Sequence, residues 1–149
     1  MTTAPAILLV EDNDDDAELT LMAFRAAHIS NAVVRVRDGV EALDYLWGRD
    51  SFAGRDPSEL PAVVLLDLNL PRLGGLDVLA AIRAGAHTTH LPVVVLTSSD
   101  EEDDRLAAYR RFVNSYVRKP VNYDQFATAA RDLGLYWLVL NRPLPRTAE

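Results

Sequence analysis

The sequence predicts an α/β domain in which helices cover both faces of a parallel β-sheet. Five apolar runs of strand length recur along the 149 residues, and helix-like stretches separate them. Strands that alternate with helices imply right-handed crossovers and helices packed on both faces of the sheet. The run at 62–66 is apolar at every position, as expected for a central strand of a parallel sheet. The length suits one domain with its own hydrophobic core.

The predicted strands are short runs of apolar, often β-branched residues. In chain order they cover residues 6–10, 32–36, 62–66, 92–96 and 115–117. One long loop, residues 48–61, precedes the third strand and is rich in Asp, Gly, Ser and Pro.

The segments between the strands carry the apolar spacing of amphipathic helices. The first of them places Ala17, Leu21 and Phe24 on one face, and shorter helices are expected at 39–47 and 75–84.

The next helix is expected within residues 100–113. There Leu106, Tyr109 and Val113 repeat the helical spacing and would share one apolar face. The residues from Ser99 to Glu102 match a capping box at its start.

Composition excludes several classes of function. A net charge of -7 argues against wholesale binding to nucleic acid, and the absence of cysteine excludes disulfides and zinc sites built on thiolates. The N-terminus lacks the basic region of a signal peptide, and no apolar run is long enough to span a bilayer. We therefore expect a cytoplasmic protein.

Polar residues stand where the predicted strands end. The carboxyl ends of parallel strands share one edge of the sheet, and ligands bind at that edge. The side chains expected there are two acids after the first strand, a third acid, a hydroxyl and an ammonium: Glu11, Asp12, Asp67, Thr97 and Lys119.

Each of these residues has an ordinary structural interpretation as well. The acids Asp14, Asp15 and Asp16 suit the first turn of a helix, where they cap it and compensate its dipole. Thr97 could be a plain strand residue and Lys119 a surface lysine. Asp67 fits such an interpretation least, because desolvating an acid at the end of a buried strand costs free energy and no structural role is evident that would compensate for it.

Clustered carboxylates indicate a cation. Oxygen ligands in small number suit Mg²⁺, which keeps several waters and shares its shell with phosphate oxygens. A carboxylate beside Mg²⁺ and an ammonium is a plausible nucleophile towards phosphorus. The set therefore predicts a magnesium-dependent phosphoryl-transfer site.

Competing sites fail on the residues they require. An EF-hand starting at Asp12 would place Ala17 where the loop needs Gly and Ala23 where it needs Glu. Acids after the first strand would repel a flavin phosphate, and no glycine-rich phosphate loop follows any strand.

Four ordered blocks of the sequence resemble the receiver domains of bacterial two-component response regulators. In chain order they are ILLVEDN, LLDLNLPRLGGLDVL, VVVLTSSD and YVRKP, with the spacing between them also preserved over residues 6–130. The resemblance implies a doubly wound five-stranded sheet of order 2-1-3-4-5, with Mg²⁺ as cofactor and a histidine kinase as partner. The stretch DAELT at 16–20 and the long loop resemble, more narrowly, single-domain regulators that partner phytochrome-type histidine kinases.

The resemblance also implies a role for each site residue. Asp67 would accept the phosphoryl group, and Glu11, Asp12, Asp67 and the backbone carbonyl of Asn69 would hold Mg²⁺. Thr97 would be the switch hydroxyl, Lys119 the phosphate contact before a cis peptide to Pro120, and Tyr116 the aromatic switch. A half-buried strand tyrosine is the plainer interpretation of Tyr116.

Two other functions share these residues. A magnesium-dependent phosphohydrolase would use the same aspartyl nucleophile, and a receiver-like adaptor would never be phosphorylated. The sequence shows no output domain. We therefore expect a phosphoacceptor rather than an enzyme, and we expect this phosphoacceptor to act through contact with another protein.

The C-terminal part of the sequence predicts an interface. The last helix begins near Asn122, with its core face formed by Phe126, Ala130 and Leu133. Beyond Gly134, six apolar residues at 135–140 would cover every side of a helix. We expect a symmetric homodimer, independent of phosphate, through the last helix, the extended arm after it and the adjoining surface of the fourth helix and fifth strand. The alternative is that the run folds back onto its own domain. The chain is thus divided into a receiver domain at 1–133 and an extension at 134–149.

Overall fold

The computed structural model describes residues 4–145 and joins five parallel strands in one sheet of order β2-β1-β3-β4-β5. This order and the α/β class confirm the predicted fold. The strands lie close to the predicted positions, at β1 Ile7–Val10, β2 Val33–Val36, β3 Val63–Leu66, β4 Val93–Thr97 and β5 Ser115–Arg118. In the central register Val10 lies beside Leu66, so the residues that follow them leave the sheet side by side.

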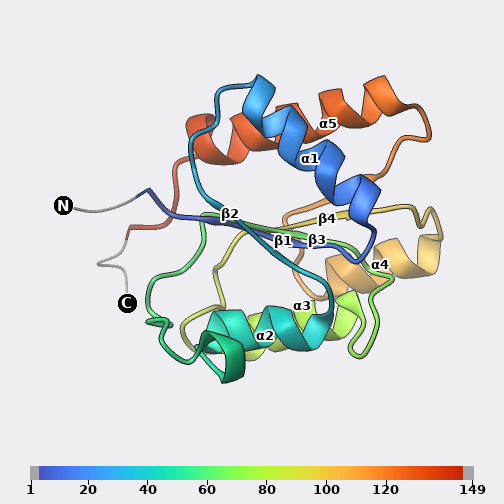
Figure 1. Ribbon diagram of the computed structural model, residues 1–149. Helices are drawn as coiled ribbons and strands as arrows, with labels where there is room; N and C mark the ends of the chain where they lie inside the picture. The colour runs from blue at the N-terminus through green and yellow to red at the C-terminus, as the bar shows by residue number, and fades with distance from the viewer. Residues whose placement is uncertain (1–3, 146–149) are drawn as a thin grey trace.

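The helices form two layers (Figure 1). Helices α1 and α5 cover one face of the sheet, and α2, α3 and α4 cover the other. Their bounds are α1 Asp14–Ala26, α2 Gly39–Trp47, α3 Gly75–Ala84, α4 Glu102–Arg110 and α5 Tyr123–Leu135. None of the helices within residues 4–145 is long and apolar enough to cross a bilayer.

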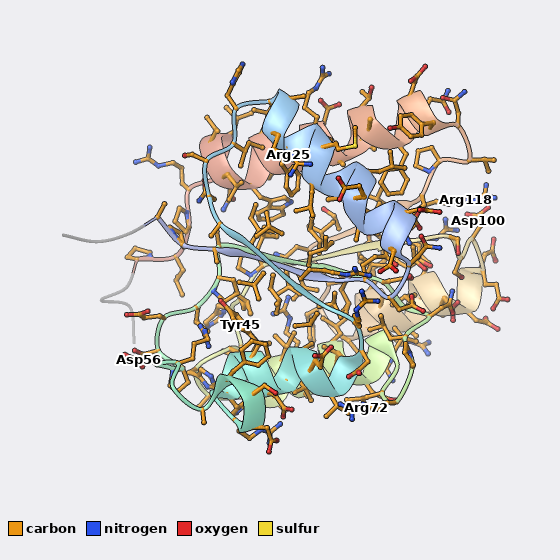
Figure 2. All side chains as sticks on the ribbon, in the orientation of Figure 1. Arg25, Tyr45, Asp56, Arg72, Asp100 and Arg118 are labelled. Atoms are coloured by element: carbon orange, nitrogen blue, oxygen red, sulfur yellow. The ribbon has the colours of Figure 1, made fainter. Side chains whose placement is uncertain are left out.

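The sheet divides the hydrophobic core in two because strand side chains alternate between its faces. Leu8 and Val10 of β1 belong to the cluster under α2 and α3, whereas Ile7 and Leu9 belong to the cluster under α1 and α5. Side chains fill the space between the sheet and both helical layers (Figure 2). The β1 and β3 strands are buried on both sides, which is why their sequences are apolar throughout.

The start of α4 differs from the prediction. The N-cap is Glu101, without a side-chain cap, and the helix begins at Glu102. The Ser99 hydroxyl instead donates to Asp104 Oδ2 at 2.6 Å. The predicted capping box is therefore wrong, because the serine lies too far before the first helical turn. Its hydroxyl accepts the N–H of the N-cap residue Glu101 at 3.4 Å but none from the first turn of the helix.

The predicted apolar face of α4 is also wrong. Leu106 and Tyr109 are 49% and 50% exposed, and the residue that α4 buries is Ala108. Val113 is buried, but it lies in the turn after the helix. A short helix can rest on the sheet through a small side chain, and the larger apolar residues beside it then face outward.

Arg83 of α3 fastens the far end of α4 to the domain. Its guanidinium donates to the carbonyl oxygen of Phe112 through Nε at 3.0 Å and Nη2 at 2.9 Å. The same group donates to Leu91 O at 2.7 Å and to Asn114 Oδ1 at 2.9 Å. The turn that joins α4 to β5 is thus held by hydrogen bonds from one guanidinium to neutral oxygens.

The long loop contains one turn of 3-10 helix, Asp50–Phe52. Arg55 organises the remainder, since its guanidinium lies 3.8 Å from the centre of the Tyr45 ring and donates to the carbonyl oxygens of Tyr45 and Glu59.

The apolar run after Gly134 divides between core and solvent. After α5 the chain makes a π-helical turn, Tyr136–Leu140. Trp137 and Leu138 pack partly against the cluster under α1 and α5, whereas Val139 and Leu140 are 66% and 67% exposed. The alternative, in which the run folds back onto its own domain, is therefore confirmed for Trp137 and Leu138, whereas the homodimer stays a prediction.

Candidate phosphoryl-transfer and metal site

Three acids meet at the carboxyl edge of β1 and β3. Glu11 and Asp12 follow β1, Asp67 follows β3, and one carboxylate oxygen of each lies within 4.8 Å of the others. Glu11 and Asp67 are buried and Asp12 is exposed. The central register brings them together, as the sequence predicted, because Val10 and Leu66 are paired.

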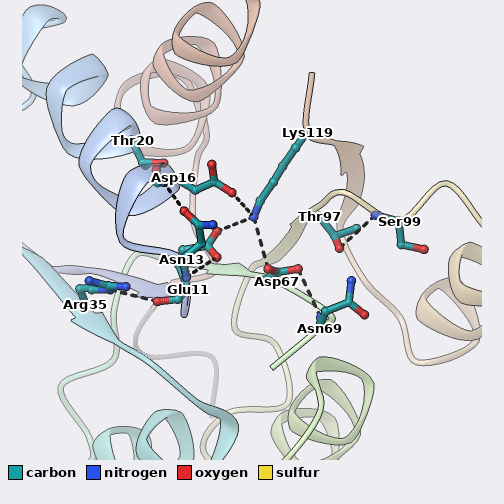
Figure 3. A network of polar contacts seen from close by, with 10 residues as sticks. All are labelled: Glu11, Asn13, Asp16, Thr20, Arg35, Asp67, Asn69, Thr97, Ser99 and Lys119. Atoms are coloured by element: carbon teal, nitrogen blue, oxygen red, sulfur yellow. Dashed lines mark hydrogen bonds and ion pairs between the residues drawn. The ribbon is translucent and has the colours of Figure 1, made fainter. Parts of the chain in front are cut away.

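Lys119 stands at the centre of these acids (Figure 3). Its Nζ lies 2.6 Å from Glu11 Oε1, 2.8 Å from Asp16 Oδ2 and 3.3 Å from Asp67 Oδ2. Its backbone N–H donates to Thr97 O at 2.6 Å, which extends the pairing of β4 and β5 beyond the strands. The ammonium therefore serves as a shared counter-ion to three carboxylates from two strand ends and one helix.

Burial and the shared ion pairs have opposite effects on the pKa values of Glu11 and Lys119. Burial raises the Glu11 pKa from 4.5 to about 7, although the hydrogen bond and charge of Lys119 oppose the rise. Burial alone would lower the Lys119 pKa, but the hydrogen bonds to Asp16 and Glu11 and the nearby charges outweigh it and raise that pKa. The site therefore keeps Lys119 charged at neutral pH and leaves Glu11 close to its titration point.

Asp16 is the site residue that the sequence interpretation missed. The sequence pattern alone predicts that this third residue of α1 caps the helix and compensates its dipole, as its neighbours do. Asn13 caps α1 by accepting from the Asp16 N–H at 2.9 Å, and Asp14 pairs with Arg35 at 2.8 Å and Arg37 at 2.9 Å. Helical side chains tilt toward the N-terminus, so an acid in the first turn lies back over the end of β1. That tilt was the available signal.

The segment after Asp67 is held close to the start of α3. The Asn69 N–H donates to Asp67 Oδ1 at 3.3 Å, and the Gly75 N–H donates to Leu68 O at 3.0 Å. A Cβ on Gly75 would lie 2.3 Å from Asp67 O, so only glycine fits there without a shift of the backbone. Asp67 is thus fixed between the sheet and the first turn of α3.

Thr97 and Tyr116 lie along the other side of the site. Thr97 is fully buried, and its Oγ1 accepts from the Ser99 N–H at 3.4 Å. The half-buried Tyr116 donates its hydroxyl to Ser99 O at 3.1 Å, and burial raises the Tyr116 pKa. Both residues therefore contact the loop that leads from β4 into α4.

The predicted cis peptide before Pro120 is wrong. Every peptide bond among residues 4–145 is trans, including the one between Lys119 and Pro120. The trans form is the one that bonds to proline favour, by about 0.5–1 kcal/mol.

The donor set fits a hard divalent cation. Three carboxylates supply oxygen, the ligand atom that Mg²⁺ and Mn²⁺ prefer, and exposed Asp12 opens the group to solvent. Such a cation would offset the repulsion that the acids exert on one another. The cluster can therefore bind a metal and present Asp67 as a nucleophile beside it.

Comparison with known proteins places this geometry in a family. The model of the response regulator receiver domain matches residues 7–131. The response regulator Rcp1 from Synechocystis sp. is 36% identical over 132 residues, which cover 89% of this chain and 88% of Rcp1. A crystal structure of the Mn²⁺-bound form of Rcp1 superposes with a TM-score of 0.88 at 33% identity, over 95% of this chain and 99% of that one.

Two further solved structures are similar over almost the whole chain. The phosphorylated cyanobacterial phytochrome response regulator RcpA is 36% identical, with a TM-score of 0.89, and the match covers 96% of this chain and all (100%) of RcpA. The bacteriophytochrome response regulator AtBRR is 50% identical, with a TM-score of 0.74, over 95% of this chain and 100% of AtBRR.

Proposed function

The chain belongs to the family of response regulator receiver domains of two-component signalling, and on that premise we propose that Asp67 is its phosphoacceptor. The observation that carries the proposal is the position of this carboxylate. Asp67 is buried at the end of a central strand, 3.3 Å from the Lys119 ammonium and beside two further acids. A histidine kinase would supply the phosphoryl group.

The neighbouring residues divide the work of the transfer. Glu11, Asp12, Asp67 and the Asn69 carbonyl oxygen would hold Mg²⁺, which when bound neutralises charge on the phosphoryl oxygens. Lys119 would contact another phosphoryl oxygen, because its ammonium already lies against the acceptor. The Mn²⁺-bound form of the homologous Rcp1 supports the proposal that this chain binds a divalent cation.

Replacing Asp67 by Asn tests this proposal directly. Incubation with acetyl phosphate and Mg²⁺ is expected to add the mass of one phosphoryl group to the wild-type protein and nothing to Asp67→Asn, because the amide is not a nucleophile towards phosphorus. Intact-mass measurement gives the readout. An adduct of equal yield on Asp67→Asn would contradict the assignment, and rapid turnover of the donor without any adduct would favour a phosphohydrolase.

Thr97 and Tyr116 are suited to carry the signal onward. Phosphorylation would draw the Thr97 hydroxyl toward Asp67, and Thr97 already bonds the Ser99 backbone. Tyr116 holds the carbonyl of the same residue, so the loop before α4 depends on both side chains. A small displacement at Thr97 would then alter α4 and the surface around β5.

The partner in our proposal is a phytochrome-type histidine kinase. The support is the similarity to RcpA and AtBRR, which are themselves named as phytochrome and bacteriophytochrome response regulators. A receiver that exchanges phosphate with such a kinase would work in the cytoplasm.

We also propose a homodimer built on the open side of the C-terminal run. Tyr136, Val139, Leu140 and Leu144 are 49%, 66%, 67% and 56% exposed, and they follow one another along the π-helical turn after α5 and the arm. Apolar residues gathered in this way mark interaction sites, and tyrosine is enriched in interface cores. Leu106 and Tyr109 of α4 offer further exposed apolar surface.

Charging the exposed part of this run should separate the dimer. Sedimentation at micromolar concentration is expected to show a dimer for wild type and a monomer for Val139→Asp/Leu140→Asp, because two carboxylates would be desolvated at the interface. Trp137 and Leu138 are left unchanged, since they pack on the core. Met22→Asp, at an exposed apolar residue of α1, is the matched control and should remain dimeric. A monomeric wild-type protein would refute the interface.

A further inference from the structure

We propose that Asp16 is a positioning residue that competes with the phosphoryl group for the Lys119 ammonium and thereby slows phosphorylation of Asp67. The inference rests on the proposed function of Asp67. It assigns to the first turn of α1 a direct part in setting the rate of phosphoryl transfer.

The hydrogen bonds of Lys119 are the basis of this inference. An ammonium has three N–H donors, and Glu11, Asp16 and Asp67 take one each. The bond to Asp16 measures 2.8 Å and the contact with Asp67 3.3 Å. Lys119 is therefore held more closely by α1 than by the residue that it would assist.

Asp16 differs from the other two acids in its relation to the metal site. Glu11 and Asp67 share the cluster with Asp12, in which a bound cation would compensate their charge. Asp16 lies outside that cluster and is in part exposed. After metal binding it would therefore keep its full attraction for Lys119, whereas that of the other two acids would fall.

The transfer step shows where this competition acts. An oxygen of Asp67 forms a bond to the phosphorus of the donor, the bond from phosphorus to the acetyl oxygen breaks, and acetate leaves with the electron pair. Lys119 stabilises the charge that passes across the phosphoryl oxygens. A carboxylate bound to the same ammonium weakens that stabilisation, and its negative charge also repels the dianionic donor.

The test compares variants of the full chain in the acetyl phosphate assay, with Mg²⁺ and with intact mass as the readout. Asp16→Asn is expected to be phosphorylated roughly fivefold faster than wild type at limiting donor, because one competing charge near the site is removed. Asp16→Glu keeps a carboxylate within reach of Lys119 and should return the rate toward that of wild type.

Asp15→Asn is the matched control. It removes the same charge from the same helical turn, at an exposed residue with no ion pair or side-chain hydrogen bond among residues 4–145. Its rate should stay near that of wild type. Acceleration also separates the proposal from a general loosening of the site, which would slow the reaction.

Equal rates for wild type and Asp16→Asn, a slower Asp16→Asn, or equal acceleration by Asp15→Asn would each overturn the inference. If the adduct forms on wild type and is absent from Asp67→Asn, such a result leaves the proposed function standing. A wild-type protein that takes up no phosphoryl group would overturn both.

Discussion

Replacing Lys119 by Met is expected to lower the free energy of unfolding of the metal-free protein by about 3–5 kcal/mol near neutral or slightly alkaline pH, the loss typical of breaking a buried ion pair. The ammonium is the shared partner of Glu11 and Asp67, which are 3% and 6% exposed. Without it these carboxylates would face one another in a poorly solvated site. Methionine fills a similar volume, so the loss reports charge rather than a cavity.

The pH dependence of this loss identifies Glu11 as its main source. The folded-state pKa of Glu11 is raised to about 7 from 4.5, so its favourable contribution is complete below 4.5 and is lost as the pH rises through 7. Removal of Lys119 raises that pKa further. The destabilisation should therefore be small in mild acid and grow toward alkaline pH in urea-unfolding measurements.

Two controls make the result specific. Lys119→Met/Glu11→Gln should recover much of the lost stability, because the buried charge is removed with its partner. Arg118→Met removes the adjacent cation, whose pairing with Asp100 is long at 3.7 Å and solvent-exposed, and should change stability by less than about 0.5 kcal/mol. A loss that is independent of pH would contradict the electrostatic account.

Replacing Asp12 by Ala should abolish phosphorylation without weakening the metal-free fold. Asp12 is the exposed member of the three-acid cluster, so its removal takes away a metal ligand and one source of repulsion at once. The variant is expected to be at least as stable as wild type when Mg²⁺ is absent. In wild type, Mg²⁺ at about one hundred times its dissociation constant should add roughly 2.7 kcal/mol, and the variant should lose that increment.

Asp15→Ala is the matched control for this experiment, since it removes an exposed acid from the following turn but none from the cluster. It should keep both phosphorylation and the stabilisation by Mg²⁺. Normal phosphorylation of Asp12→Ala at millimolar Mg²⁺ would show that the metal is held elsewhere.

The strands and the meeting of their polar ends were predictable because both follow from short-range rules. Buried strands such as 63–66 are apolar throughout, and parallel strands end at a common edge, so Glu11 and Asp67 had to approach one another. The role of Asp16 was not predictable in the same way. It depends on how the first turn of α1 is set over Lys119, across 103 residues of sequence.

The errors have a similar physical origin. The spacing of Leu106, Tyr109 and Val113 predicts an apolar stripe on one side of a helix. It does not show whether the sheet is wide enough to bury that stripe. In the structure α4 contacts the domain through Ala108 instead. For the run after Gly134, apolar residues on every side left two outcomes open, and the packing of Trp137 divided the run between them.

Because Ala108 is the buried residue of α4, tilting this helix away from the sheet costs little free energy. Losing the burial of one methyl group costs about 1 kcal/mol, which one additional charged hydrogen bond can offset. The C-terminal end of the helix stays anchored, because Arg83 holds the Phe112 carbonyl and Val113 is buried beside it. Its N-terminal end is tied by hydrogen bonds at Ser99 and by the long, exposed ion pair between Arg118 and Asp100. The helix is therefore held most firmly at the end far from the phosphoacceptor, and a shift at Ser99 can tilt its N-terminal end relative to the sheet.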